Sequence, residues 1–188
     1  AGIAREMRLA TSRSPYLRLV DARAHQPGHV FYERFDNIPG PNLDALESAP
    51  EYPDRPDATA LMGGFTAPAD AGEHYGARLR AWISPPISGE YVFRLSTDDQ
   101  GALYLAESPE AERRERVAAV PSWVSQDEFG KHDAQQSKPI LLKRGQRYYL
   151  EAVFKENRGE DHCTVGWIRP DGRQETPIPG IYATPVGE

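Results

Sequence analysis

Two adjacent acids, Asp98 and Asp99, are the strongest candidates for chemistry in this sequence of 188 residues. They lie between a strand-like run and Gln100-Gly101, a pattern that indicates a turn. Carboxylate oxygens are the ligands that calcium prefers in proteins, so a turn with two of them could hold half of a calcium site. The same turn could instead satisfy Asp98 with its own amides and leave Asp99 solvated, which needs no ion.

Residues that could support catalysis are sparse. The sequence has no glycine-rich phosphate loop, no zinc-spaced cluster of histidine and cysteine, and no nucleophile elbow. The single cysteine, Cys163, alternates with Val165 and Trp167, which predicts a buried, unreactive thiol and excludes an internal disulfide. Two acids that share an ion are both ionised, so neither could be the proton donor of a glycosidase. We therefore expect that this chain is not an enzyme, although a larger protein containing it could be one, such as a glycosidase.

The charge balance limits the classes of partner. The formal net charge is -6, whereas binding to nucleic acid relies on a basic surface, so we expect no nucleic acid partner. The mixed run Arg113–Arg116 is interpreted as a solvated, self-paired surface stretch. No apolar run approaches the roughly 18 residues of a membrane span, which predicts no membrane insertion. The N-terminus has no apolar signal core, so we expect a removed leader or a piece of a larger protein.

Apolar residues alternate with polar ones in several short segments, which is the period of β-strands. The segments are 30–35, 75–83, 91–95, 148–154 and 163–167. The 17 prolines and 16 glycines are spread between them and favour many short strands joined by turns. An all-β fold, an antiparallel sandwich or barrel with long loops, is therefore predicted. Residues 1–28 are expected to be an N-terminal arm or linker that could add one strand, and residues 29–188 to form the domain.

Three blocks, in this order, resemble the PA14 domain family. The first is Ile83-Ser84-Pro85-Pro86-Ile87-Ser88-Gly89-Glu90-Tyr91-Val92-Phe93 running into Asp98-Asp99. The second is Gln136–Ile140 with Gly145, Tyr148–Glu151 and Lys155-Glu156, and the third is Gly159–His162 with Val165-Gly166-Trp167 and Pro177–Gly180. Tyr32–Phe35 with Ile38-Pro39-Gly40 also resembles the start of the family. The resemblance covers about residues 29 to 184.

The resemblance implies a β-sandwich that occurs as a module of secreted and cell-surface proteins, including glycosidases and adhesins. In lectin-like members the two adjacent acids, joined by a cis peptide bond, hold a calcium ion that ligates sugar hydroxyls. An asparagine and backbone carbonyls of a second loop complete the ion's ligands. Carried over to this sequence, these are Asn157 and the carbonyl groups near Gly159 and Asp161. Many bacterial members have glycine where this chain has Asn157-Arg158, so residues 157–159 could equally be an ordinary hairpin loop.

Three further residues border the implied site and could contact a sugar. Trp123 lies in a loop-like stretch and could form an aromatic platform, although burial is an equally good interpretation. Arg158 and His162 could donate hydrogen bonds to sugar oxygens, although His162 could also be structural. Trp82 and Trp167 are predicted to pack within strands.

Two hypotheses follow for the function. The first is a non-catalytic, calcium-dependent carbohydrate-binding module that tethers a larger extracellular or cell-surface protein to glycans or polysaccharide. The second is a calcium-free module with a structural or protein–protein role in such a protein.

Overall fold

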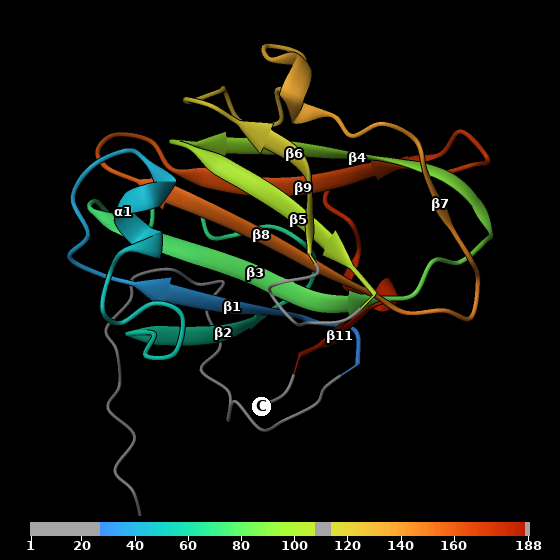
Figure 1. The fold of residues 1–188 in the computed structure, drawn as a ribbon, viewed down its shortest axis with the longest axis horizontal. Coiled ribbons are helices and arrows are strands. Elements are labelled where there is room, and N and C mark those ends of the chain that lie inside the picture. The colour runs from blue at the N-terminus through green and yellow to red at the C-terminus, as the bar shows by residue number, and fades with distance from the viewer. Residues whose placement is uncertain (1–26, 108–113, 187–188) are drawn as a thin grey trace, which may run out of the picture.

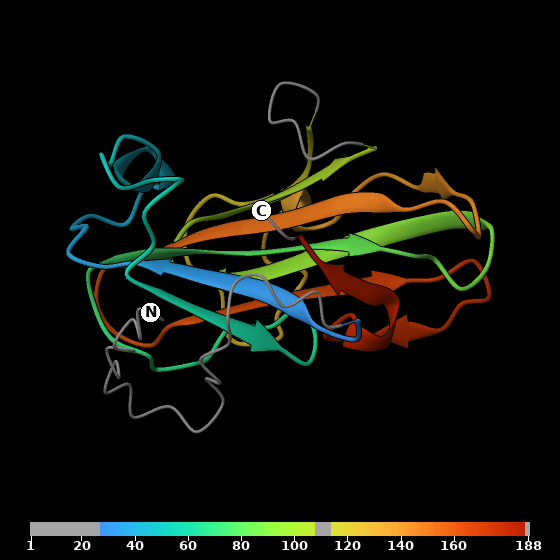
Figure 2. The same ribbon diagram turned by 90° about the horizontal axis from the view of Figure 1, so that it is seen from below.

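Two antiparallel β-sheets packed face to face form the fold, which a computed structural model describes for residues 27–107 and 114–186 (Figures 1 and 2). The prediction of an all-β sandwich is confirmed. Of the N-terminal arm expected at residues 1–28, residues 1–26 lie outside the described part. No helix of the described part has the length and apolar character needed to cross a lipid bilayer.

The larger sheet has seven strands, and its long central strands are those with the clearest alternation in the sequence. In spatial order they are β2 (Ala58–Met62), β1 (Val30–Phe35), β3 (Tyr75–Ile83), β8 (Tyr148–Glu156), β5 (Gly101–Ala106) and β6 (Glu115–Val120), with β11 (Ala183–Pro185) also paired to β3. Strand β11 pairs with residues 81–83 of β3 and β1 pairs with residues 76–80, so both lie along the same strand. The amide of Gly28 donates to the carbonyl oxygen of Ala183 at 2.9 Å and joins these two segments.

The smaller sheet has four strands and covers the inner face of the larger one. In spatial order they are β10 (Gln174–Glu175), β9 (His162–Ile168), β4 (Gly89–Asp98) and β7 (Ile140–Leu142). The sequence around residues 43–46 forms the short helix α1 (Leu43–Glu47), which lies against β3 and β8. The 3-10 turns cover Asp133–Gln135 and Gly180–Tyr182.

The core lies between the sheets and contains the alternating apolar residues of both. Trp167 of β9 is fully buried there with Tyr91 and Phe93 of β4. Cys163 is also fully buried, and burial raises the pKa of its thiol, as expected for an unreactive cysteine.

The outer face of the larger sheet carries a cluster of charged side chains. Glu33 of β1 is 3% exposed and accepts hydrogen bonds from the guanidinium groups of Arg78 and Arg80 on β3. Glu151 of β8 pairs in the same way with Arg114 and also accepts a hydrogen bond from the hydroxyl group of Tyr149. These acids are compatible with burial because each is paired with arginine.

Strands β2 and β6 were not predicted from the sequence. Glu115 and Arg116, interpreted above as part of a self-paired surface stretch, instead begin β6, and Arg114 pairs with Glu151. Both strands lie at an edge of the larger sheet, where a strand has only one neighbour and can keep polar residues.

A close backbone approach at Gly180 yields the first prediction. A Cβ atom at Gly180 would lie 2.1 Å from the carbonyl oxygen of Gly28 and 2.6 Å from that of Gly63. We expect Gly180→Ala to lower the free energy of unfolding by about 1–3 kcal/mol, since backbone must move to admit the methyl group. Urea denaturation measures this, with Gly63→Ala, whose Cβ would meet no atom within 4 Å, as the matched control. Equal losses in the two variants would contradict the prediction.

Candidate carboxylate cluster at one end of the sandwich

Asp98 and Asp99 lie at one end of the sandwich, where β4 turns into β5. Asp98 is the last residue of β4, and the peptide bond between the two acids is cis, as the resemblance implies. The amide of Asp99 donates to the carbonyl oxygen of Lys155 at 2.7 Å. The carboxylate of Asp99 accepts a hydrogen bond of 2.9 Å from the amide of Asn157. These bonds tie the acidic turn to the end of β8, which pairs with β5 in the larger sheet.

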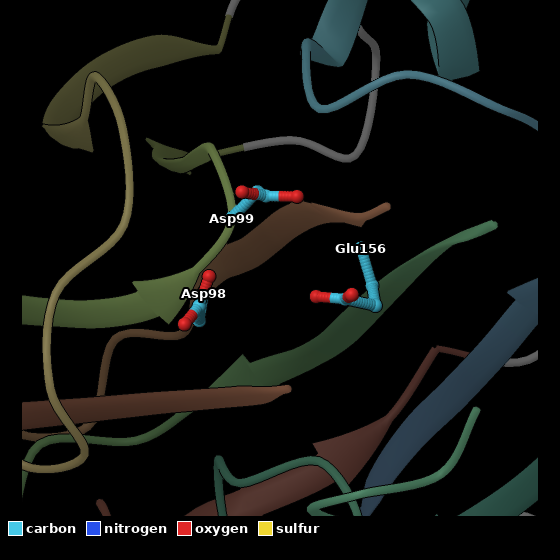
Figure 3. A group of neighbouring side chains, drawn as sticks. All are labelled: Asp98, Asp99 and Glu156. Carbon is cyan, nitrogen blue, oxygen red and sulfur yellow. The ribbon is translucent and has the colours of Figure 1, made fainter. Parts of the chain in front are cut away.

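Glu156, the last residue of β8, lies beside this turn and forms a three-carboxylate cluster with it. One ligand oxygen from each of Asp98, Asp99 and Glu156 lies within 4.8 Å of the other two. Figure 3 shows the carboxylate of Glu156 directed toward the two aspartates. Asp98 and Asp99 are partly exposed, whereas Glu156 is completely buried. We call these three residues the carboxylate cluster.

The electrostatics of the carboxylate cluster disfavour its fully ionised form. Burial, followed by the charge of Asp99, raises the pKa of Glu156 to about 8. Burial and the same neighbour raise the pKa of Asp98 to about 6. Burial also lowers the pKa of the nearby Lys155 ammonium to about 8. A divalent cation among the three carboxylates would stabilise their ionised forms by charge attraction.

The residues that the resemblance implies as further calcium ligands lie in the loop between β8 and β9, and their side chains contact protein. The Oδ1 atom of Asn157 accepts from the amide of Gly40 at 2.9 Å and lies 3.1 Å from Nδ1 of His74. The Oδ2 atom of Asp161 accepts from the amides of Ala71 and Gly72, at 2.8 and 3.1 Å.

The backbone of the same loop is partly hydrogen-bonded and partly exposed. The carbonyl oxygen of Asp161 accepts a hydrogen bond from the amide of Asp70 at 3.2 Å. Gly159 has a φ of 115° and is exposed. The loop therefore borders the cluster, but its two oxygen-bearing side chains hold neighbouring loops in place.

The three residues expected to contact a sugar differ in their accessibility. Trp123 is 52% exposed, and the ammonium group of Lys131 lies 3.2 Å from its ring centroid, over one face of the indole. Arg158 is exposed, with Nε 3.4 Å from Nε2 of His74. His162 is 5% exposed, and its Nε2 atom lies 3.0 Å from Oγ of Ser96, so its ring is held inside the protein.

The loop that carries Trp123 packs against the strand that carries Asp98. The amide of Val124 donates to the carbonyl oxygen of Thr97 at 3.1 Å, and Oγ of Ser96 donates to the carbonyl oxygen of Ser125 at 3.2 Å. Lys131 lies close enough to Asp98 to lower the pKa of that carboxyl group, although burial outweighs this effect. The loop that carries Trp123 and Lys131 is therefore near the cluster.

Glu156 is the member of the cluster that sequence reasoning missed. It has the same parity on β8 as Leu150, Ala152 and Phe154, which face the core. An acid that continues the core-facing series of a strand is uncommon unless it is paired or binds a metal. That parity is the signal that could have identified it.

A family model and a curated protein each match part of this chain. The family model described as PA14 domain matches residues 50–180. A mouse protein, N-acetyl-beta-glucosaminyl-glycoprotein 4-beta-N-acetylgalactosaminyltransferase 1, is 36% identical over 102 residues, which are 50% of this chain and 10% of that protein. The chain thus spans about a tenth of the length of this relative.

Solved structures with low sequence identity share the fold. A PA14 sugar-binding domain from an RTX adhesin has a TM-score of 0.61 at 12% identity, over 86% of this chain and 100% of that one. The A domain of epithelial adhesin 6 from Candida glabrata, in complex with Galβ1-3GlcNAc, has a TM-score of 0.59 at 12% identity, over 94% and 92% of the two chains. With the family model matching most of its length, the chain belongs to the PA14 domain family.

Proposed function

We propose that this domain is a non-catalytic carbohydrate-binding module that binds glycan hydroxyls through a calcium ion held at Asp98 and Asp99. The observation that carries the proposal is the carboxylate cluster, in which oxygens of three acids converge within 4.8 Å at one end of the sandwich. Calcium takes six to eight oxygen ligands in a tolerant geometry, so carboxylates and a few carbonyl groups leave positions for sugar hydroxyls.

The relatives support a glycan as the partner. Two of the solved domains with this fold are a sugar-binding domain and an adhesin domain in complex with a disaccharide. The exposed face of Trp123 and the guanidinium of Arg158 flank the cluster from two loops and would contact the sugar. We extend the proposal to an extracellular or cell-surface location within a larger protein, which is in keeping with the small fraction of its curated relative that the chain matches.

A catalytic role is disfavoured by the spacing of the acids. Glycosidase carboxyl groups lie about 5–9.5 Å apart across the scissile bond. In the carboxylate cluster one oxygen from each of three acids converges within 4.8 Å, an arrangement that suits a shared cation.

A calcium-free structural or protein–protein module is the second candidate. The observation that favours it is the engagement of Asn157 and Asp161, whose side chains accept hydrogen bonds from Gly40, Ala71 and Gly72. Because these hydrogen bonds hold the 157–161 loop in place, the loop could form part of a protein–protein interface without an ion.

Thermal unfolding with calcium chloride and with a chelator separates the two candidates. A ligand that binds only the folded state at a hundredfold excess over its Kd adds about 2.7 kcal/mol of stability. We expect that gain for the natural sequence and its loss in Asp98→Asn. The matched control is Glu90→Gln, an exposed acid near the opposite end of β4, which should keep the gain.

A glycan array probed with calcium and with chelator then tests the ligand. Binding to glycans in calcium alone supports the module proposed here. No stabilisation by calcium, together with no effect of Asp98→Asn, would rule out the calcium site. Stabilisation by calcium without glycan binding would leave the second candidate, with a structural ion.

A further inference from the structure

The carboxylate cluster joins the two sheets. Asp98 ends β4 of the smaller sheet and Asp99 follows it, whereas Glu156 ends β8 of the larger sheet. Strands β4 and β8 are not hydrogen-bonded neighbours, and each pairs only within its own sheet. The turn after Asp98 already leads from β4 into β5 of the larger sheet, so a cation bound by all three acids would add a direct link between the ends of β4 and β8 (Figure 3).

The carboxylate of Glu156 is buried and, within the described part of the chain, not hydrogen-bonded. It is 0% exposed, and neither of its carboxylate oxygens has a hydrogen-bond partner among the described residues. The adjacent Lys155 does not serve this purpose, since its Nζ atom donates to the carbonyl oxygens of Tyr75 and Glu156, each at 2.7 Å. Buried acids are normally paired, hydrogen-bonded or bound to a metal. In the described structure this side chain is neither ion-paired nor hydrogen-bonded, which leaves a metal as its partner.

The spacing of the cluster fits calcium. Calcium–oxygen bonds are about 2.3–2.6 Å, so two oxygens on opposite sides of the ion lie about 4.6–5.2 Å apart. The three ligand oxygens lie within 4.8 Å of one another, which is within that limit. Opposite ligands of magnesium, at about 2.0–2.1 Å, are nearer 4.1 Å apart and need near-ideal octahedral geometry. Three carboxylates without nitrogen or sulfur are also the ligand type of a hard cation.

We propose that Glu156 is a direct ligand of the calcium ion and that the ion clamps the end of β4 to the end of β8. This inference rests on the proposed function, because it takes Asp98 and Asp99 as the other carboxylate ligands. The side chains of Asn157 and Asp161 are then not needed as ligands, in keeping with their hydrogen bonds to neighbouring loops. The clamp stabilises the domain whether or not a glycan is bound.

Glu156→Gln tests the clamp, with calcium alone as the probe. Calorimetric titration of the full 188-residue chain should show at least about a tenfold loss of calcium affinity, since changes to groups behind metal ligands already cost that much. In chelator, Glu156→Gln should melt at or above the natural sequence, because a neutral amide replaces a buried acid that has no hydrogen-bond partner in the described part of the chain. In calcium it should not gain the stabilisation that the natural sequence gains.

The matched control is Glu160→Gln, which removes an exposed acid that acts on Asp98 only through its charge. Calcium affinity that falls no further in Glu156→Gln than in Glu160→Gln would overturn the clamp and leave the proposed function intact. If the natural sequence does not bind calcium, both fail. Circular dichroism verifies folding, and if Glu156→Gln does not fold, Glu156→Asp replaces it, with the same tenfold criterion.

Discussion

Replacing Trp167 by alanine should destabilise the domain by about 3–5 kcal/mol, a large part of the 5–15 kcal/mol that such a domain has. The indole is fully buried between the sheets, and its ring centroid lies 5.0 Å from that of Tyr91 and 5.4 Å from that of Tyr182. Its Nε1 atom donates to Oε2 of Glu175 at 2.7 Å. The substitution removes both the packing and the hydrogen bond, and the rigid sheets on either side cannot close the cavity.

Urea denaturation followed by circular dichroism measures this loss. Trp167→Phe keeps an aromatic ring but not the donor, so we expect a smaller loss of about 1–3 kcal/mol. Leu141→Ala, at a side chain that is 64% exposed, should change stability by less than about 0.5 kcal/mol. A loss below about 1 kcal/mol for Trp167→Ala would mean that this end of the core contributes little to stability.

Replacing Glu33 by alanine should cost a comparable 3–5 kcal/mol, roughly the penalty for breaking a buried ion pair. Its Oε2 atom accepts from Nε of Arg78 at 2.6 Å and from Nε of Arg80 at 2.7 Å. Arg78 is 7% exposed, and its Nη2 atom also donates to the carbonyl oxygen of Pro53 at 2.8 Å. Without Glu33, two guanidinium groups remain close together on the sheet with no carboxylate between them.

The control for Glu33 is an ion pair at the surface. Glu51 lies 3.7 Å from Arg55, with both side chains exposed, so Glu51→Ala should cost less than about 1 kcal/mol. The difference between the two variants, measured by urea denaturation, should persist at high salt because buried pairs are poorly screened. Similar small losses in both variants would show that the arginines find water or other partners when Glu33 is removed.

The central strands could be predicted because burial on one face imposes a period of two. Strand β3 shows this directly, with Tyr75, Ala77, Leu79 and Ile83 buried in the core. The edge strands β2 and β6 could not, since a strand with only one neighbour keeps exposed positions that tolerate charged residues. Strand β6 begins with exposed Glu115 and Arg116, and its pairing with β5 shifts register beside Tyr104. Neither feature leaves a periodic signal.

The candidate site was only partly accessible from the sequence. Asp98 and Asp99 are neighbours in the sequence, so their proximity could be read directly from it. Glu156 follows 57 residues after Asp99, and the two meet because β5, which begins just after Asp99, pairs with β8 in the larger sheet. The hydrogen bonds of Asn157 and Asp161 depend equally on where residues 40 and 71–72 lie in space. Contacts between segments that are distant in the sequence are set by strand pairing and packing, which a pattern of alternation does not encode.

The pairing of β11 and β1 along the same strand also distinguishes the two ends of the sandwich. Gly28 and Ala183 meet beside Ile83 at one end of β3, whereas Tyr75, at the other end, pairs with Glu156. Eight residue steps of about 3.3 Å separate these ends by about 26 Å. The contact between Gly28 and Ala183 therefore lies at the end of the sandwich opposite the carboxylate cluster. A ligand bound at the cluster would approach the domain from the end remote from this contact.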